Sequence, residues 1–216
     1  MEQTQTITAL KAQKRNPERI SVYLDGQYAF GLARIVAAWL AVGQSLSEAK
    51  IAQLRKQDAL EKAYQSALHL LSYRQRSEQE IRRKLLEKGF DQEDCERVLE
   101  RLKTAGLSGD SDFAQVWVEN RQLFRPRSRR MLTAELRQKG VANDDIEQAL
   151  TGLPDEEQLA YAAAMRSIRK WQGLDRDTFR KRLSGFLARK GFNYEAVSAT
   201  IRKVWDEIQE PSAHTE

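Results

Sequence analysis

Three short stretches of the chain decide its fold: Leu85–Phe90 reads LLEKGF, Leu136–Val141 reads LRQKGV and Leu187–Phe192 reads LARKGF. Each fits the pattern Leu-x-x-Lys-Gly-apolar, and the three glycines recur at equal intervals of 51 residues. The apolar positions on both sides keep this interval, as in the sets Ile81, Leu132 and Leu183; Cys95, Ile146 and Val197; and Leu99, Leu150 and Ile201. A fixed period with a preserved apolar register indicates tandem structural repeats, here three copies of one unit.

The pattern inside each copy predicts helices. In the first copy, Ile81 and Leu85 share one helix face and Gly89 supplies the left-handed position that ends a helix. Cys95 then opens the apolar stripe of the next helix, and we expect it in a core. A further amphipathic helix precedes this pair in each copy, and Ser128 reads as the N-cap of a middle helix. We predict a mainly α fold, an elongated tandem array of three three-helix repeats.

The first 45 residues have a different character. Ile20–Leu24 and Gln27–Phe30 are β-prone and flank Asp25-Gly26, a dipeptide favoured in type I′ turns, which predicts a hairpin. Thr6–Gln13 can add a third strand through a turn at Arg15–Pro17. A small N-terminal β-hairpin module is therefore expected ahead of the helical array.

Two helices are predicted between this module and the first repeat. Arg34–Val42 reads as a short helix closed by Gly43, and Ser45–Glu48 matches a capping box that starts a longer helix. The expected division is a β-rich extension (1–45), a connecting helix (46–57), three repeats (58–107, 108–154 and 155–207) and a disordered tail (208–216).

The composition limits the class of protein. Of 216 residues, 36 are Lys or Arg and 31 are Asp or Glu, giving a net charge of +5. The longest apolar run, Ile35–Val42, is far shorter than the roughly 18 residues of a spanning helix, and no secretory signal is recognisable, so we expect a cytoplasmic protein away from membranes. One cysteine and two histidines offer no disulfide and no metal-ligand spacing, so no metal or other cofactor is expected.

The positive charge is clustered in each repeat, which suggests a polyanionic partner contacted through phosphates. Several of these side chains precede or begin a middle helix, whose N-terminus also favours anions. They can equally form i,i+4 ion pairs with neighbouring glutamates, and that alternative stays open for each of them. The candidate contact residues are Arg74, Arg76, Arg82, Arg83, Arg125, Arg127, Arg129, Arg130, Arg169, Lys170, Arg180, Lys181 and Arg182.

Other conspicuous residues have a structural explanation. Lys88, Lys139 and Lys190 precede the turn glycines and are expected to complement helix C-termini. Four aromatic side chains can stack on nucleic-acid bases, but their apolar surroundings in the sequence favour a core role: Trp117, Trp171, Tyr73 and Phe124.

Two stretches are similar to sequence signatures of the RecX family of recombination regulators. Tyr73–Phe90 resembles the family's first-repeat signature and Leu107–Arg121 its second, and the resemblance extends over residues 58–207. It implies a protein that binds along the groove of a RecA filament on single-stranded DNA and inhibits strand exchange, filament extension and ATP hydrolysis, modulating DNA repair and the SOS response. It implies no catalysis of its own. A monomer that binds DNA alone only weakly is expected.

Three other hypotheses remain open. A helix, a glycine turn and a second helix allow a sequence-independent DNA-binding module, although no helix carries a face suited to base readout. A nuclease using Asp110, Asp112 and Glu119 around a divalent metal is disfavoured, because no phosphate loop, nucleophile motif or nearby histidine accompanies these acids. A helical adaptor for an unrelated protein is separated from the first hypothesis only by the family resemblance.

Overall fold

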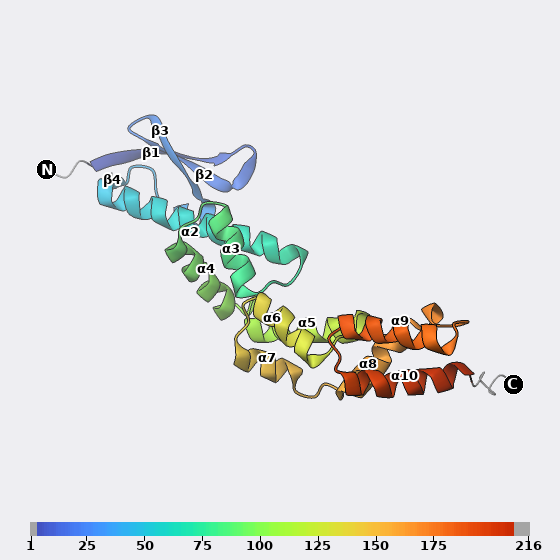
Figure 1. Ribbon diagram of the computed structural model, residues 1–216. Helices are drawn as coiled ribbons and strands as arrows, with labels where there is room; N and C mark the ends of the chain where they lie inside the picture. The colour runs from blue at the N-terminus through green and yellow to red at the C-terminus, as the bar shows by residue number, and fades with distance from the viewer. Residues whose placement is uncertain (1–3, 210–216) are drawn as a thin grey trace. The chain divides into compact units, whose positions relative to one another are not determined.

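The computed structural model describes residues 4–209, which form two compact units (Figure 1). The first unit contains residues 4–76 and 80–108, and the second contains residues 77–79 and 109–209. Within these described residues, no helix is both long and apolar enough to cross a membrane. The predicted tail lies outside them, except for Ile208 and Gln209, which belong to the last helix.

The first unit begins with a four-stranded antiparallel sheet in the order β3-β2-β1-β4. Its strands are β1 (Thr4–Gln13), β2 (Asn16–Leu24), β3 (Gln27–Ala33) and β4 (Ser45–Ser47). The predicted hairpin is confirmed, since Leu24 pairs with Gln27 and both turn residues have positive φ, 48° at Asp25 and 84° at Gly26. The N-terminal module is thus a hairpin extended into a sheet.

The extra strand is confirmed as β1, but its predicted turn was placed too late. Gln13 pairs with Asn16, so the turn consists of Lys14 and Arg15 alone. Pro17 already belongs to β2. The backbone pairing of Asn16 therefore overrides the turn tendency of the Asn-Pro dipeptide.

Two predictions for the segment after the sheet are wrong in their bounds. Helix α1 spans only Arg34–Ala37, because the chain then returns to the sheet, where Gly43 N donates to Ile7 O at 2.8 Å. Ser45 is not an N-cap, since its backbone pairs with β1 as part of β4. Ser47 takes that role, and its Oγ accepts from Lys50 N at 3.3 Å at the start of α2 (Glu48–Tyr73).

Helix α2 joins the sheet to the first repeat. Its N-terminal half carries Leu54 into the core of the sheet module, beside Ile7 and Leu32. Its C-terminal half packs Ala63 and Ala67 against α3 (Glu78–Glu87) and α4 (Gln92–Thr104). Cys95 lies in this second core with no exposed surface, as predicted. One continuous helix therefore contributes to both cores.

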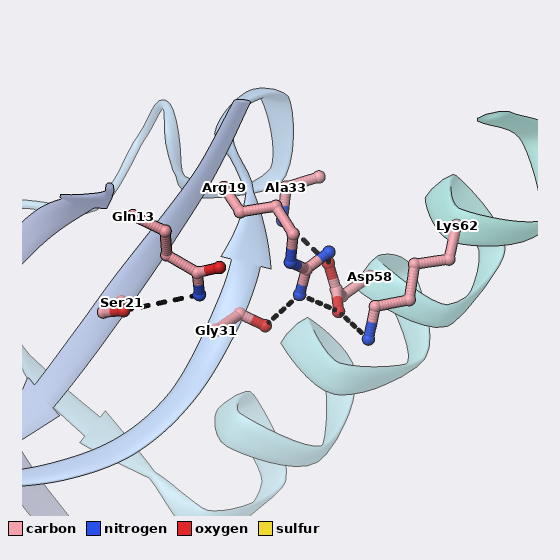
Figure 2. A network of polar contacts seen from close by, with 7 residues as sticks. All are labelled: Gln13, Arg19, Ser21, Gly31, Ala33, Asp58 and Lys62. Atoms are coloured by element: carbon pink, nitrogen blue, oxygen red, sulfur yellow. Dashed lines mark hydrogen bonds and ion pairs between the residues drawn. The ribbon is translucent and has the colours of Figure 1, made fainter. Parts of the chain in front are cut away.

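A buried carboxylate holds the sheet on this helix (Figure 2). Asp58 on α2 is 4% exposed and accepts from the backbone N–H of Ala33 at 2.7 Å. Its two oxygens also accept from Arg19 at 3.2 and 3.1 Å, and Lys62 Nζ lies 2.8 Å away. Arg19 reaches the carbonyl of Gly31 as well, at 2.8 Å. Strands β2 and β3 are thus tied to α2 by one carboxylate.

The second unit contains two further three-helix repeats, each with its own core. One repeat consists of α5 (Asp110–Phe124), α6 (Arg129–Gln138) and α7 (Asn143–Leu150). The other consists of α8 (Glu156–Met165), a 3-10 turn η1 (Ile168–Lys170), α9 (Arg176–Arg189) and α10 (Tyr194–Gln209). Ser128 caps α6 as predicted, because its Oγ accepts from Met131 N at 3.1 Å. The predicted fold of three three-helix repeats behind a strand module is confirmed.

The aromatic residues follow the core prediction only in part. Trp171 is 6% exposed, and Trp117 packs beside Phe113, as expected. Tyr73 and Phe124 are instead 70% and 66% exposed, so a core role is wrong for both. Each is the last residue of its helix, beyond the final turn that faces the core.

The turn glycines also allow a close contact between repeats of the second unit. Gly191 has a φ of +92°, and a Cβ built on it would lie 2.5 Å from Ser128 Oγ. Ser128 is fully buried, and its N–H donates to Lys190 O at 3.2 Å. A related contact occurs elsewhere in this unit, where the side-chain Oγ of Ser77, rather than a backbone N–H, donates to Lys139 O at 2.7 Å. The turn at Gly191 therefore rests on Ser128, the N-cap of α6.

Candidate functional site

The candidate cations of the first repeat are all engaged by internal partners. Three form ion pairs and one donates to a carbonyl: Arg74 with Glu80 at 3.0 Å, Arg82 with Glu96 at 2.6 Å, Arg83 with Glu87 at 3.7 Å, and Arg76 with Leu70 O at 3.1 Å. A phosphate has to compete with these partners before it can bind.

Two candidate arginines of the second repeat hold the fold. Arg129 donates to Leu150 O at 3.0 Å and to Leu153 O at 2.5 Å, and so satisfies carbonyls where α7 ends. Arg130 reaches Gly191 O at 3.5 Å, at the glycine turn of the next repeat. Both side chains therefore stabilise the fold through hydrogen bonds to backbone carbonyls, a role that the sequence did not reveal.

We expect Arg129→Ala to lower the free energy of unfolding of the second unit by about 1.5–3 kcal/mol, because charge-assisted hydrogen bonds to terminal carbonyls are lost. The change is measured by urea denaturation followed through tryptophan fluorescence. Arg125→Ala is the matched control and should shift stability by less than about 0.5 kcal/mol. Equal effects of the two substitutions would contradict this assignment.

Of the seven remaining candidates, Arg127 pairs with Glu135, and the other six point to solvent without internal partners in the part of the chain that the structure describes. Their side chains make no hydrogen bond or ion pair with any residue between 4 and 209: Arg125, Arg169, Lys170, Arg180, Lys181 and Arg182. All of them belong to the second unit. Among the candidate cations, those available to a partner are therefore concentrated in the second unit, not spread evenly over the three repeats as the sequence suggested.

Four cations gather where the second repeat meets the third, and we name Arg125, Arg127, Lys170 and Lys190 the cationic joint. Arg125 ends α5, Lys170 ends η1 and Lys190 follows α9. Lys190 Nζ donates to the carbonyl oxygen of Pro126 at 3.0 Å. Because Pro126 stands between Arg125 and Arg127 in the sequence, this hydrogen bond holds the ammonium group of Lys190 near both arginines. Arg127 Nε lies 2.8 Å from Glu135 Oε1, an ion pair without hydrogen-bond geometry.

The electrostatics of the cationic joint favour an anion. Burial lowers the pKa of Lys190, and the neighbouring charges of Arg127, Arg125 and Lys170 lower it further. Glu135, the carboxylate paired with Arg127, is shared with Arg121 at 2.8 Å. An anion placed among these cations relieves their mutual repulsion, and a phosphate group also offers several acceptor oxygens.

Sequence reasoning gave Lys190 a structural role at a helix C-terminus and left it out of the candidate contacts. The contact with Pro126 O supports a structural role, but the surrounding cations add an electrostatic one. The Lys-Gly pair that recurs in each repeat was the feature of the sequence that drew attention to Lys190. It did not reveal that the chain before Ser128 brings Arg125 and Arg127 beside this lysine.

Among the acidic residues that a nuclease would use to bind a metal ion, Asp110 already has another contact. Asp110 and Asp112 lie in the first turn of α5, and Asp110 Oδ1 accepts from Glu78 N at 2.9 Å. In the part of the chain that the structure describes, no group of three or more His, Cys, Asp or Glu side chains is placed to hold a metal ion.

Comparison with known families defines the class. Models described as the first, second and third three-helix domains of RecX match residues 63–102, 110–150 and 155–201. A model of the regulatory protein RecX N-terminal domain matches residues 5–47. The fold is thus a tandem three-helix repeat array behind a strand module. The chain belongs to the RecX family of regulatory proteins.

Individual relatives and solved structures agree. The chain is 33% identical over 208 residues to a regulatory protein RecX of Bacillus pumilus, covering 94% of this chain and 79% of that protein. It is 36% identical over 167 residues to one of Amycolatopsis mediterranei, covering 76% and 93%. A crystal structure of a regulatory protein RecX matches with a TM-score of 0.71 at 30% identity, covering 96% of this chain and 100% of that one. A RecX from Lactobacillus salivarius shares the fold, with a TM-score of 0.57 at 21% identity over 71% of this chain and 98% of that one.

Proposed function

We propose that this chain binds the RecA filament on single-stranded DNA and inhibits its ATP hydrolysis, strand exchange and extension, without catalysis of its own. The observation that carries the proposal is the cationic joint, in which Arg125 and Lys170 have no partner among residues 4–209. Membership in a family of regulatory proteins supports a binding function over an enzymatic one.

The partner's chemistry follows from the charge. A nucleoprotein filament presents phosphates and acidic protein surface in a regular array, and a basic repeat protein gains from each contact it makes there. Contacts on linked repeats raise one another's effective concentration, so a filament should bind more tightly than a free RecA subunit. We therefore expect affinity for filaments to exceed affinity for either component alone.

The test is RecA-dependent ATP hydrolysis on single-stranded DNA, with the wild-type chain or Arg125→Glu/Lys170→Glu titrated in. We expect the wild type to inhibit near stoichiometric ratios and the variant to need about tenfold more protein, since two attractive contacts become repulsive. The slope of log affinity against log salt should also shrink by about 1–2 in the variant.

The matched control is Lys14→Glu/Arg15→Glu, which changes the net charge by the same amount in the turn between β1 and β2. It should inhibit like the wild type. If both variants weaken equally, only the net charge matters and the joint is not the contact site. If the wild type leaves hydrolysis unchanged on intact filaments, RecA is not the partner, and DNA binding or an adaptor role replaces the proposal.

A further inference from the structure

The third repeat carries an open groove between α9 and α10, two helices that lie side by side in the second unit (Figure 1). The groove has a volume of about 480 Å³. Its lining includes Arg176 and Arg180 from α9, Arg202 from α10, and the apolar side chains of Ile201 and Trp205 from α10. None of the three arginines makes a hydrogen bond or ion pair within residues 4–209.

In the first repeat, an ion pair closes the space between the two helices that correspond to α9 and α10. Ser184 and Ser198 line the groove of the third repeat, and they stand two repeat periods after Arg82 and Glu96. Arg82 bridges to Glu96 with contacts of 2.6 and 2.9 Å, which ties α3 to α4 across their interface. Two small serines replace that bridge in the third repeat, so the space between its helices stays open.

The second repeat uses the arginine equivalent to Arg180 in another way. Arg129, one period before Arg180, turns toward the end of α7 and binds the carbonyls of Leu150 and Leu153. The equivalent carbonyls in the third repeat belong to Ile201 and Val204, and α10 continues beyond both of them to Gln209. Those carbonyls are used inside the helix, so Arg180 has no such acceptor.

The lining distinguishes a peptide from a nucleic acid. Asp177 and Asp206 also line the groove beside the three arginines, so its charge is mixed and only weakly positive, and several other lining residues are apolar. The lining includes the aromatic side chains of Tyr194 and Trp205, but a strand of DNA favours a uniformly cationic track, which the two aspartates interrupt. A groove between two packed helices, with apolar lining residues and unpaired arginines on both helices, instead fits an amphipathic helix that carries carboxylates beside its apolar face.

We propose that the α9/α10 groove of the third repeat docks an acidic amphipathic helix of the filament's protein component, while the cationic joint contacts phosphates. This inference rests on the proposed function. Carboxylates of the docked helix pair with Arg176, Arg180 and Arg202, and its apolar side chains cover Ile201 and Trp205.

The test uses two variants, of which only the first closes the groove without changing the net charge. Ser184→Arg/Ser198→Glu installs the ion pair of the first repeat, and Arg180→Gln/Arg202→Gln removes the charges while leaving the space open. Both variants are compared with the wild type by fluorescence anisotropy against RecA filaments on labelled oligothymidylate and against the same oligothymidylate without RecA. Tryptophan fluorescence and thermal unfolding verify that each variant folds.

We expect both variants to bind filaments at least about tenfold more weakly and bare oligothymidylate as the wild type does. If each variant weakens filament and bare DNA equally, the groove binds nucleic acid and the proposal is overturned. If neither variant affects filament binding, the groove has no role there. A wild type that binds filaments no better than bare DNA refutes the proposed function itself, and this inference with it.

Discussion

Asp58→Ala should lower the free energy of unfolding of the first unit by about 3–5 kcal/mol, because the change removes the acceptor of a buried network and leaves its donors behind. Arg19 loses both carboxylate contacts, and the N–H of Ala33 loses its acceptor at 2.7 Å. The measurement is urea denaturation followed by circular dichroism. Hydrogen exchange should show faster opening of β2 and β3.

The pH dependence gives a second readout of the same carboxylate. Burial alone raises the pKa of Asp58, but hydrogen bonds from Arg19, Lys62 and Ala33 outweigh it and hold the pKa below the ordinary value of 3.8. A carboxyl with a lowered folded-state pKa stabilises the fold above about pH 4, and its contribution is lost as the pH falls through the folded-state pKa. The wild type should therefore lose more stability on acidification than Asp58→Ala does.

Glu93→Ala is the matched control. Glu93 also meets two cations, Lys56 at 3.2 Å and Arg97 at 2.5 Å, but its side chain is 57% exposed. Exposed ion pairs contribute little, so this change should cost less than about 1 kcal/mol. A loss at Glu93 as large as that at Asp58 would show that burial is not the source of the effect.

The second large effect is expected at a turn glycine. Gly191→Ala should lower the free energy of unfolding of the second unit by about 2–4 kcal/mol, of which about 1–2 reflects the left-handed backbone at φ +92°. The rest comes from crowding, because the new Cβ meets Ser128 Oγ at 2.5 Å and Met131 Cβ at 3.0 Å. Tryptophan fluorescence during urea denaturation measures the change.

Gly89→Ala separates the two contributions. Gly89 has a similar φ of +86°, but a Cβ there meets nothing within 4 Å. It should therefore show only the backbone cost, about 1–2 kcal/mol. Equal losses at Gly89 and Gly191 would mean that the contact with Ser128 carries no energy.

Much of the fold was predictable because local rules agree with one another. The 51-residue period, the Asp25-Gly26 turn and the cap at Ser128 each depend on residues close in the chain. The predicted bounds are wrong where pairing with a strand distant in the sequence overrides the local pattern. Ser45 does not act as the predicted N-cap, because its backbone pairs with Thr6, a partner that no local pattern identifies.

The candidate site was predictable in composition and not in arrangement. The sequence identified clusters of cations but could not separate Arg129, which caps α7, from Arg125, which has no side-chain partner within residues 4–209. Both are arginines next to a helix end. Their difference depends on where the carbonyls of Leu150 and Leu153 lie after packing.

By itself, the sequence determined that this protein has three related helical repeats, a strand module before them and an excess of basic residues, because spacing and charge are properties of the chain. Only the tertiary structure decided which charges remain available. Ion pairs such as Arg82 with Glu96 form between helices that packing brings together, and Lys190 meets Arg125 and Arg127 for the same reason. Such contacts join residues on different helices and turns, whose proximity depends on how the cores beneath them pack.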